Sequence, residues 1–269
     1  FRSEDRKRRQ DAANPEPSSR PSPGFSRFKV VESSEYDSEE EQQVDTTDEE
    51  DRRGKEACRV IRVAEDMRTV QNFLGTKSDI AEACSPPRMT AEGRSMGLRC
   101  GFAFDLSVPD VDGTNWDFSK RSCRQRAWKL LLEQRPYMLV GSPLCTPWSI
   151  IQNLNMMTPE GKKKVMEERK KSAVHLRFCV AMYREQHRHG RYFVHEHPQT
   201  SEAWKTSCME DLVNEQWTYS AQADMCQFGM KDKDGYHVRK TTRFITNSAC
   251  IAGRLEKRCD GRHDHRPLV

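Results

Sequence analysis

From about residue 56 onwards, short apolar runs alternate with longer segments of helical periodicity, and this alternation restricts the possible folds more than any other feature. A strand, a helix and a second strand in succession form a parallel pair, so repeated alternation predicts a mostly parallel, doubly wound α/β sheet. The expected strands are 79–84, 98–106, 137–142, 191–198 and 242–248. The expected helices are 60–74, 89–97, 120–134, 160–188 and 201–215. We therefore assign residues 56–250 to one Rossmann-like α/β domain.

The first 55 residues differ in composition from this domain. A Pro/Ser-rich stretch precedes the acidic run at 38–51, SEEEQQVDTTDEED, and few apolar side chains are present to bury. We predict a disordered tail over residues 1–55. Residues 1–51 carry 8 Lys and Arg against 15 Asp and Glu, whereas the rest of the chain carries 37 against 26. A basic body favours a polyanion partner such as nucleic acid, although a solvated basic surface explains the same charges.

The sequence also bears on the cellular setting. No run of about 18 apolar residues is present, so we expect no membrane span and no membrane partner. The ten cysteines are scattered without a Cys-x-x-Cys pair, and no signal peptide is apparent, which indicates reduced thiols in an intracellular protein. The basic stretch at 6–9 is consistent with a nuclear location. Because the chain lacks an initiator methionine, we expect it to be a piece of a longer reading frame.

Chemically versatile side chains follow several of the predicted strands. They are Ser85-Pro86-Pro87, Asp105, Cys145 and Glu196. Ligands of doubly wound sheets bind at the carboxyl ends of the strands, so we expect these residues to share a site. Cys145 follows a Gly-Ser-Pro turn and would be a nucleophile if nearby positive charge or a helix N-terminus lowered its pKa. An inert structural cysteine is the alternative.

Two histidines flank Glu196 and leave a hydrolase open as a hypothesis. A cysteine hydrolase would need His195 or His197 within hydrogen-bond reach of Cys145. The sequence His-Glu-His-Pro is not the His-Glu-x-x-His helix of zinc proteases, whose histidines share one helical face.

Three motifs together suggest a family. Residues 141–149 are GSPLCTPWS, residues 196–198 are EHP, and residues 239–244 are RKTTRF. Their order and spacing resemble the DNA cytosine-C5 methyltransferases, and more closely the divergent methyltransferase-like modules of retroelement (retrotransposon) polyproteins. In that family the corresponding motifs are a Gly-x-Pro-Pro-Cys-Gln-x-Phe-Ser loop, a Glu-Asn-Val strand end and an arginine-bearing strand. The resemblance covers roughly residues 78–250.

The resemblance implies a class I methyltransferase fold and methyl transfer from S-adenosylmethionine to carbon 5 of a cytosine flipped out of DNA. Cys145 would add to carbon 6 of the ring, and Glu196 would bind the ring nitrogen and the amino group. Arg239 or Arg243 would contact the ring oxygen. The expected cofactor-binding residues are Ser85, Pro86, Pro87, Asp105, Asp117, Ser142 and Pro143.

The sequence departs from the family pattern near both parts of this site. Prolines 86 and 87 stand where the family has glycines, whose backbone approaches the cofactor closely. Leu144 and Thr146 replace a proline and a glutamine beside Cys145. The family's DNA-reading domain after the arginine strand is expected to be missing or supplied by neighbouring polyprotein domains. Two hypotheses follow: an active methyltransferase, or a catalytically inactive nucleic-acid-binding module of a mobile-element polyprotein.

Residues 251–269 form a basic C-terminal segment that contains cysteine and histidine. Cys259, His263 and His265, with the preceding Cys250, offer four ligands for a tetrahedral zinc site, and Cys226 is an alternative ligand. The spacing matches no standard zinc finger, and both histidine rings can point the same way only if the chain bends. A basic tail that contacts phosphate, or is simply solvated, is the competing hypothesis.

Overall fold

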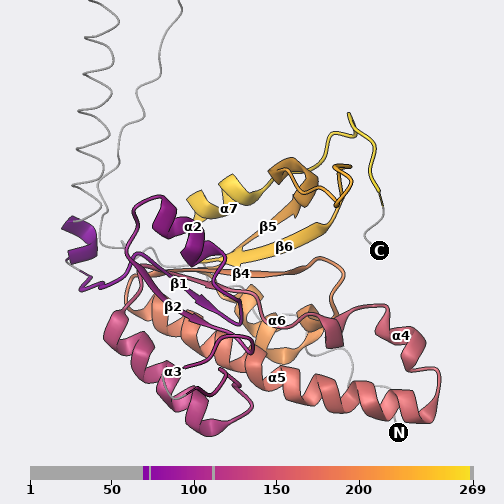
Figure 1. Cartoon of the computed structure of the whole chain (residues 1–269), viewed down its shortest axis with the longest axis horizontal. Helices are drawn as coiled ribbons and strands as arrows, with labels where there is room; N and C mark the ends of the chain where they lie inside the picture. The colour runs from indigo at the N-terminus through magenta and orange to yellow at the C-terminus, as the bar shows by residue number, and fades with distance from the viewer. Residues whose placement is uncertain (1–68, 73, 111–112, 267–269) are drawn as a thin grey trace, which may run out of the picture. The chain divides into compact units, whose positions relative to one another are not determined.

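The computed structural model, which describes residues 69–72, 74–110 and 113–266, contains a six-stranded sheet in which four adjacent strands pair in parallel (Figure 1). The strands are β1 (Ile80–Ala83), β2 (Cys100–Phe104), β3 (Met138–Gly141), β4 (Tyr192–Pro198), β5 (Tyr219–Asp224) and β6 (Thr241–Thr246). Their order is β2-β1-β3-β4-β6-β5, and β6 runs antiparallel to both of its neighbours. The expected mostly parallel, doubly wound sheet is confirmed.

Helices cover both faces of this sheet (Figure 1). On one face lie α3 (Arg121–Gln134), α5 (Pro159–Arg188) and α6 (Ser207–Asn214). On the other lie α2 (Met89–Ser95) and α7 (Ala249–Leu255). The domain is therefore a three-layer α/β/α structure.

The two faces of the sheet bury cores of different size. The larger core lies against α3, α5 and α6, and it includes the fully buried side chains Phe104, Leu131, Leu139, Tyr183 and Phe193. The smaller core lies under α7 and joins Val194, Ala221, Phe244 and Ala252. Alternation along β4 sends Phe193 to the larger core and Val194 to the smaller one. The same alternation decides which residues at the end of β4 can share a site.

The long helix α5 follows the sequence expectation closely. Thr158 caps it, because the Thr158 hydroxyl accepts a hydrogen bond of 3.1 Å from the Gly161 amide, and Pro159 occupies the first turn. The predicted helix at 201–215 is instead broken in two, a 3-10 turn at Glu202–Lys205 and α6. Thr206 separates them with an extended backbone, and its hydroxyl donates to the Ala203 carbonyl.

Two predictions fall partly or wholly outside the described residues. The tail at 1–55 lies outside them, and of the helix expected at 60–74 only residues 69–72 are described as helical. Every described residue belongs to one of the two units into which contacts divide the chain, Gly54–Val269. Over the described ranges, no helix combines the length and the hydrophobicity that crossing a bilayer requires.

Candidate functional site

The strand order reverses between β1 and β3, because the chain continues from β1 to β2 on one side and β3 pairs with β1 on the other. Ligands of doubly wound sheets bind outside the carboxyl ends of the strands at such a point. Ala83 pairs with Gly141 there, and the Ser142 amide donates a hydrogen bond of 3.1 Å to the Ala83 carbonyl. The loops that follow β1 and β3 therefore begin side by side.

The loop after β1 is organised by a buried carboxylate, Glu82. Its oxygens accept hydrogen bonds from the amides of Arg88, Met89 and Thr90 at 3.3, 3.0 and 2.8 Å. They also accept from the hydroxyls of Ser85 and Thr90 at 3.1 and 2.6 Å. The Glu82 side chain thus occupies the backbone donors at the start of α2. Glu82 was not predicted from the sequence, where its signal is a charged side chain inside an apolar strand.

The same loop contains a left-handed residue that is not glycine. Cys84 has a φ of 55°, a conformation that favours glycine. Pro86 and Pro87 follow and carry no amide hydrogen. The tight turn after β1 is therefore made by Cys84, and the Glu82 carboxylate holds the shape of the loop.

The Cys84 thiol is part of a buried sulfur pair. Its Sγ lies 3.5 Å from Sγ of Cys179 on α5. The hydrogen bond with Cys179, burial, and the nearby charge of Asp105 all raise the pKa of Cys84 well above its ordinary value. Cys84 therefore remains a neutral thiol and is a poor nucleophile.

The two predicted cofactor carboxylates lie close to one histidine of α5, His175. Asp117 lies 3.5 Å from the His175 ring, and the charge of Asp105 also acts on that ring. Burial lowers the pKa of His175 more than the two carboxylates raise it. Burial alone would raise the pKa of Asp117, but hydrogen bonds from Ser119 and the charge of His175 lower it overall. Asp105 is half-buried, and one of its oxygens accepts from the amide and hydroxyl of Ser107 at 2.9 and 2.6 Å.

Cys145 precedes a short 3-10 turn, Thr146–Trp148, which α5 holds in place. The indole of Trp148 donates a hydrogen bond of 2.8 Å to the buried Ser172 hydroxyl. Arg169 donates to the Pro147 carbonyl at 2.9 Å, and its guanidinium lies over the Trp148 ring. The Cys145 side chain itself is half-buried, and its thiol makes no hydrogen bond to any described residue. The loop thus presents a free thiol on a fixed turn.

Two further contacts fix this loop at the strand edge. A Cβ atom at Gly141 would collide with the Tyr183 hydroxyl of α5, so glycine allows α5 to approach β3. The Ser201 hydroxyl, after β4, donates a hydrogen bond of 3.5 Å to the Trp148 carbonyl. The loops after β1, β3 and β4 are therefore connected along one edge of the sheet.

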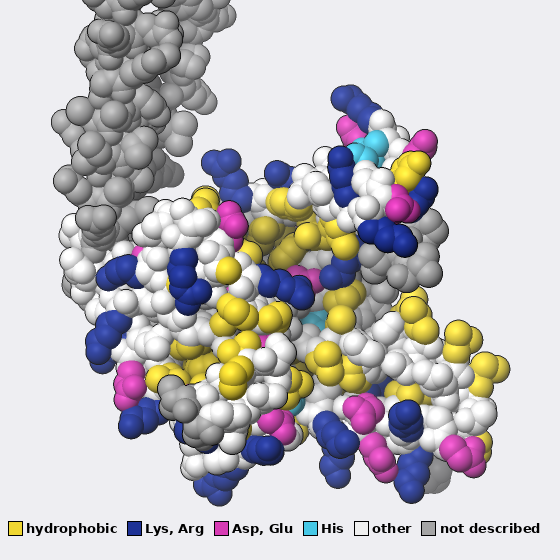
Figure 2. Space-filling view, viewed as in Figure 1, with side chains coloured by type: hydrophobic (Ala, Val, Ile, Leu, Met, Phe, Trp, Pro, Cys, Tyr) yellow, Lys and Arg dark blue, Asp and Glu magenta, His cyan; other side chains and the backbone are white. Residues whose placement is uncertain are grey.

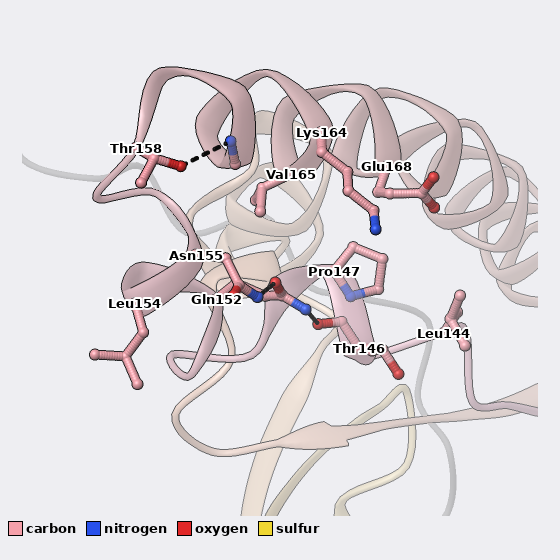
Figure 3. A pocket seen from close by; sticks show the side chains of 11 residues that line it. Leu144, Thr146, Pro147, Gln152, Leu154, Asn155, Thr158, Lys164, Val165 and Glu168 are labelled. Atoms are coloured by element: carbon pink, nitrogen blue, oxygen red, sulfur yellow. Dashed lines mark hydrogen bonds between the residues drawn. The ribbon is translucent and has the colours of Figure 1, made fainter.

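A cavity of about 470 Å³ adjoins the Cys145 loop (Figure 3). Leu144, Thr146 and Pro147 form one wall, and the start of α5 forms another. Between them lies α4 (Gln152–Asn155), which the sequence analysis did not predict. Cys145 does not line this cavity, so the cavity is a neighbour of the thiol rather than its binding pocket.

Neighbouring residues at the end of β4 face opposite sides of the sheet. His195 and His197 point to the α5 side, where both rings pack edge-on against Trp204. Burial lowers the pKa of His195 well below its ordinary value and that of His197 to about 4, so both are neutral near pH 7. Glu196 points the other way, and Lys240 approaches its carboxylate to 3.4 Å.

The two predicted arginines do not join Glu196. Arg243 pairs with His197 across the β4–β6 ladder and therefore shares its face, with the guanidinium 4.7 Å from the Trp204 ring. Arg239 forms an ion pair of 3.4 Å with the buried Asp224. The cation beside Glu196 is Lys240, which lies between the two arginines in the sequence and which the sequence analysis did not select.

The arrangement needed by a cysteine hydrolase is absent from the described part of the chain. His195 bonds the Tyr183 hydroxyl at 3.1 Å, and both ring nitrogens of His197 are buried without a hydrogen-bond partner. No histidine among the described residues bonds the Cys145 thiol, so no base is in place to activate it for hydrolysis.

The C-terminal segment brings together three of its four predicted metal ligands. Cys259, His263 and His265 lie with Cys226, and their ligand atoms are all within 4.8 Å of one another. Cys250 is exposed on α7 and does not belong to this cluster. The alternative ligand Cys226 takes the position that the sequence analysis gave to Cys250.

Figure 2 shows a depression in the middle of the view, with hydrophobic side chains inside it and Lys and Arg side chains around it.

No model of a known protein family matches the sequence, and no curated protein is similar enough to count as a relative.

Proposed function

We propose that the chain is a divergent S-adenosylmethionine-dependent DNA cytosine-C5 methyltransferase-like domain with Cys145 as its nucleophile. The observation that carries this proposal is the position of Cys145, half-buried in the loop beside the strand-order reversal. Glu196 lies at the carboxyl end of the adjacent parallel strand β4. Addition to a pyrimidine ring requires a thiolate at one ring carbon and a hydrogen-bonding carboxyl group at the ring's polar edge.

The residues of the chain divide this chemistry between them. Cys145 Sγ would form a bond to carbon 6 of the cytosine, which makes carbon 5 nucleophilic. Glu196 would bind the ring nitrogen and the amino group, and Lys240 would fix the position of its carboxyl group. S-adenosylmethionine, when bound, supplies an electrophilic methyl group. The bond from Cys145 to carbon 6 would break again once the proton on carbon 5 has been lost.

The donor set around β1 favours a nucleoside cofactor without phosphates. Dinucleotide-binding sheets place a pyrophosphate on the amides at the start of the helix after the first strand. Here those amides bind the Glu82 carboxylate, and a second anion beside it would be repelled. Asp105, at the end of β2, has one oxygen without a hydrogen bond from any described residue, and a ribose hydroxyl can donate to it. S-adenosylmethionine carries a ribose but no phosphate, and its one carboxylate is accompanied by an ammonium group and a sulfonium cation, so it fits both observations.

The alternative is a catalytically inactive nucleic-acid-binding module of a mobile-element polyprotein. A specific observation favours it: Arg243 lies on the face opposite Glu196, and Arg239 is paired with Asp224. Neither arginine is therefore placed beside the carboxylate with which it was expected to act. This alternative predicts salt-dependent binding of nucleic acid that does not require Cys145.

A covalent trap separates the two functions. The full chain would be incubated with S-adenosylmethionine and a random-sequence DNA duplex in which fluorine replaces the hydrogen on carbon 5 of each cytosine. Release of the cysteine requires that the substituent on carbon 5 leave as a cation, which hydrogen can do and fluorine cannot. An active enzyme therefore stays bonded to the DNA after transfer, and the adduct survives denaturing electrophoresis. We expect an adduct that Cys145→Ser abolishes and that the control Cys208→Ser, at another half-buried cysteine, retains. If no adduct forms and Cys145→Ser binds DNA with the same salt dependence as the unmodified chain, the inactive module would be established instead.

Cofactor binding can be measured without a target sequence. Calorimetric titration of the full chain with S-adenosylhomocysteine should give micromolar binding that Asp105→Ala weakens at least tenfold. The matched control is Asp110→Ala, in the loop that follows β2. A folded chain that does not bind S-adenosylhomocysteine would overturn the cofactor assignment.

A further inference from the structure

The chain end folds back along the sheet and crosses the loop between β5 and β6. Lys257 lies beside Ala223 as a short parallel bridge to β5, and the Asp224 amide donates 2.8 Å to the Lys257 carbonyl. Farther on, Arg266 bridges to Val238, which lies in the loop before β6. Two segments about 30 residues apart in the sequence are thus held side by side.

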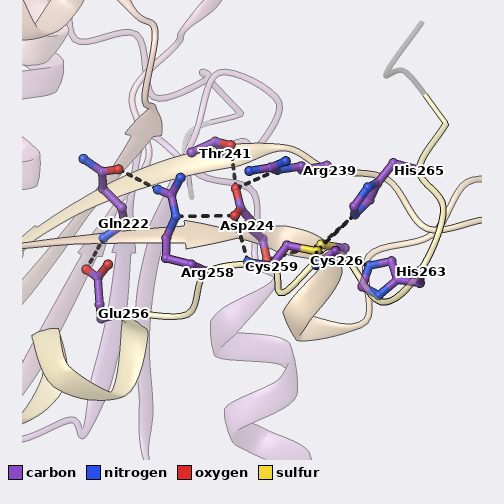
Figure 4. A network of polar contacts seen from close by, with 11 residues as sticks. Gln222, Asp224, Cys226, Arg239, Thr241, Glu256, Arg258, Cys259, His263 and His265 are labelled. Carbon is purple, nitrogen blue, oxygen red and sulfur yellow. Dashed lines mark hydrogen bonds and ion pairs between the residues drawn. The ribbon is translucent and has the colours of Figure 1, made fainter.

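Four atoms that can ligate a metal, two sulfurs and two imidazole nitrogens, meet where these segments cross (Figure 4). Cys226 lies in the 3-10 turn Met225–Phe228 that follows β5, and the other three residues, Cys259, His263 and His265, come from the chain end. His265 Nε2 lies 3.3 Å from Cys226 Sγ and 3.4 Å from Cys259 Sγ. His263 Nε2 lies 3.7 Å from Cys259 Sγ.

These separations match the edges of a zinc tetrahedron. Zinc bonds of about 2.3 Å to sulfur and about 2.0 Å to nitrogen, at tetrahedral angles, place the sulfur and nitrogen ligands about 3.5 Å apart. The three sulfur–nitrogen distances fall close to this value on both sides. The chain bends at His263, which allows both imidazoles to point to one centre.

Surrounding groups orient the ligands as outer partners do in metal sites. The Gly261 amide points at Cys259 Sγ from 3.4 Å, a contact that stabilises a thiolate. The Cys259 amide in turn donates 2.9 Å to the buried Asp224 carboxylate. Asp224 is itself held by Thr241 at 2.6 Å and by Arg239 and Arg258, each at 3.4 Å (Figure 4). Six residues from β5, the loop before β6, β6 and the chain end therefore form one polar network that includes the ligand Cys259.

We propose that Cys226, Cys259, His263 and His265 bind one zinc ion that fastens the C-terminal segment to the loop between β5 and β6. Two thiolates and two imidazoles in tetrahedral positions select zinc among the common divalent metals. Four protein ligands leave no position for water or substrate, so the site is structural. The proposal stands independently of the proposed function, because no residue of the Cys145 site takes part.

The site also braces one partner of Glu196. The Met225 amide, next to Cys226, donates 3.0 Å to the carbonyl of Lys240. Lys240 holds the Glu196 carboxylate at 3.4 Å. Loss of the metal would therefore weaken the contact between Met225 and Lys240, and with it the position of the Lys240 side chain beside Glu196.

Metal analysis of the full chain purified without added chelator tests the proposal. We expect close to one zinc per chain, and a strong loss in Cys226→Ser and in Cys259→Ser. Cys250→Ser is the matched control, because Cys250 was the other candidate ligand and is exposed on α7; it should keep the full amount. Replacement of zinc by cobalt should give the visible absorption of a tetrahedral site with sulfur ligands, and this absorption should be absent in Cys226→Ser.

A second measurement covers variants that fail to fold. A chelator added to the unmodified chain should raise hydrogen exchange at 257–266 and around 226, while exchange in β1 and β3 stays unchanged. A folded chain without zinc or cobalt binding would overturn the proposal, as would full metal content in Cys226→Ser. A disulfide between Cys226 and Cys259 in the freshly purified chain would overturn it as well.

Discussion

The Glu196 carboxylate lies 3.4 Å from the Lys240 ammonium group, and Arg243, three residues beyond Lys240, lies on the opposite face of the sheet. Lys240 and Arg243 are close in the sequence, but they lie on opposite faces of the sheet and therefore have different roles. Lys240 belongs to the candidate site, whereas Arg243 packs over Trp204.

Substitution of Lys240 should therefore affect mainly the rate of covalent trapping, and substitution of Arg243 should affect mainly the free energy of unfolding. Lys240→Met should lower the rate of covalent trapping roughly tenfold, because Glu196 loses the group that positions it. It should change stability by under about 1 kcal/mol, as expected for a partly exposed ion pair. Arg243→Met should cost about 1 to 2 kcal/mol of unfolding free energy through the lost contact with the Trp204 ring. Urea denaturation and the trapping assay on both variants measure the two effects, and equal trapping rates would remove Lys240 from the site.

The buried carboxylate of Glu82 should be essential to the loop after β1. Glu82→Gln keeps the size of the side chain but replaces one acceptor oxygen by a donor that faces backbone amides. We expect a loss of about 2 to 4 kcal/mol, because hydrogen bonds to a charged group are among the stronger ones. Glu92→Gln on the exposed side of α2 is the control and should lie within about 0.5 kcal/mol of the unmodified chain. Chemical denaturation measures the free energy of unfolding of both variants, and equal values for the two would contradict the prediction.

The close approach of α5 to β3 predicts a coupled pair of substitutions. Gly141→Ala should destabilise the fold by about 1 to 3 kcal/mol, because the added methyl group meets the Tyr183 hydroxyl. Tyr183→Phe removes that hydroxyl, although it also breaks the 3.1 Å hydrogen bond to His195. The double variant should be less destabilised than the sum of the single variants. Strictly additive free energies of unfolding would mean that the two residues do not interact.

The two neutral histidines of β4 predict a loss of stability in mild acid. The pKa of His197 is about 4 in the folded chain, lowered by burial, against about 6.5 when unfolded. The unfolded chain therefore takes up the proton first as the pH falls from about 6.5 towards 4, and stability is lost over that window. His197 alone should contribute about 2 kcal/mol of this loss between about pH 7 and about pH 5.

A variant isolates that contribution. His197→Gln should flatten the pH dependence of the unfolding free energy over this range, whatever it costs at neutral pH. Parallel slopes for His197→Gln and the unmodified chain would show that His197 does not titrate differently on unfolding.

The four parallel strands, β6 and the long helix could be predicted because local patterns determine them, whereas β5 was not among the expected strands. The apolar runs at 137–142 and 191–198 end at a Gly-Ser-Pro turn and at Pro198, and the strands end there too. The break between the two helical pieces at Thr206 escaped prediction, because a threonine hydroxyl that bonds its own backbone leaves the helical pattern of the sequence unchanged.

The composition of the site was harder to predict, because it depends on register and on distant contacts. Which face Arg243 occupies follows from the pairing of β4 with β6, and a shift of one residue would move it to the other face. Glu82 acquires its role only when α2 is placed over the end of β1. Cys226 could be preferred to Cys250 only once the chain end was seen to lie along β5.

The segment that lies along β5 also changes how the domain meets other chains. β5 is the last strand of the sheet, and an uncovered edge strand offers its backbone as a template for strands of neighbouring molecules. Here the outward amides of Gln222 and Asp224 already donate to the Glu256 carboxylate and the Lys257 carbonyl, at 2.6 and 2.8 Å. The returning chain end therefore acts as a cover against edge-to-edge aggregation, and a domain shortened before residue 256 would expose a template for intermolecular β-sheet.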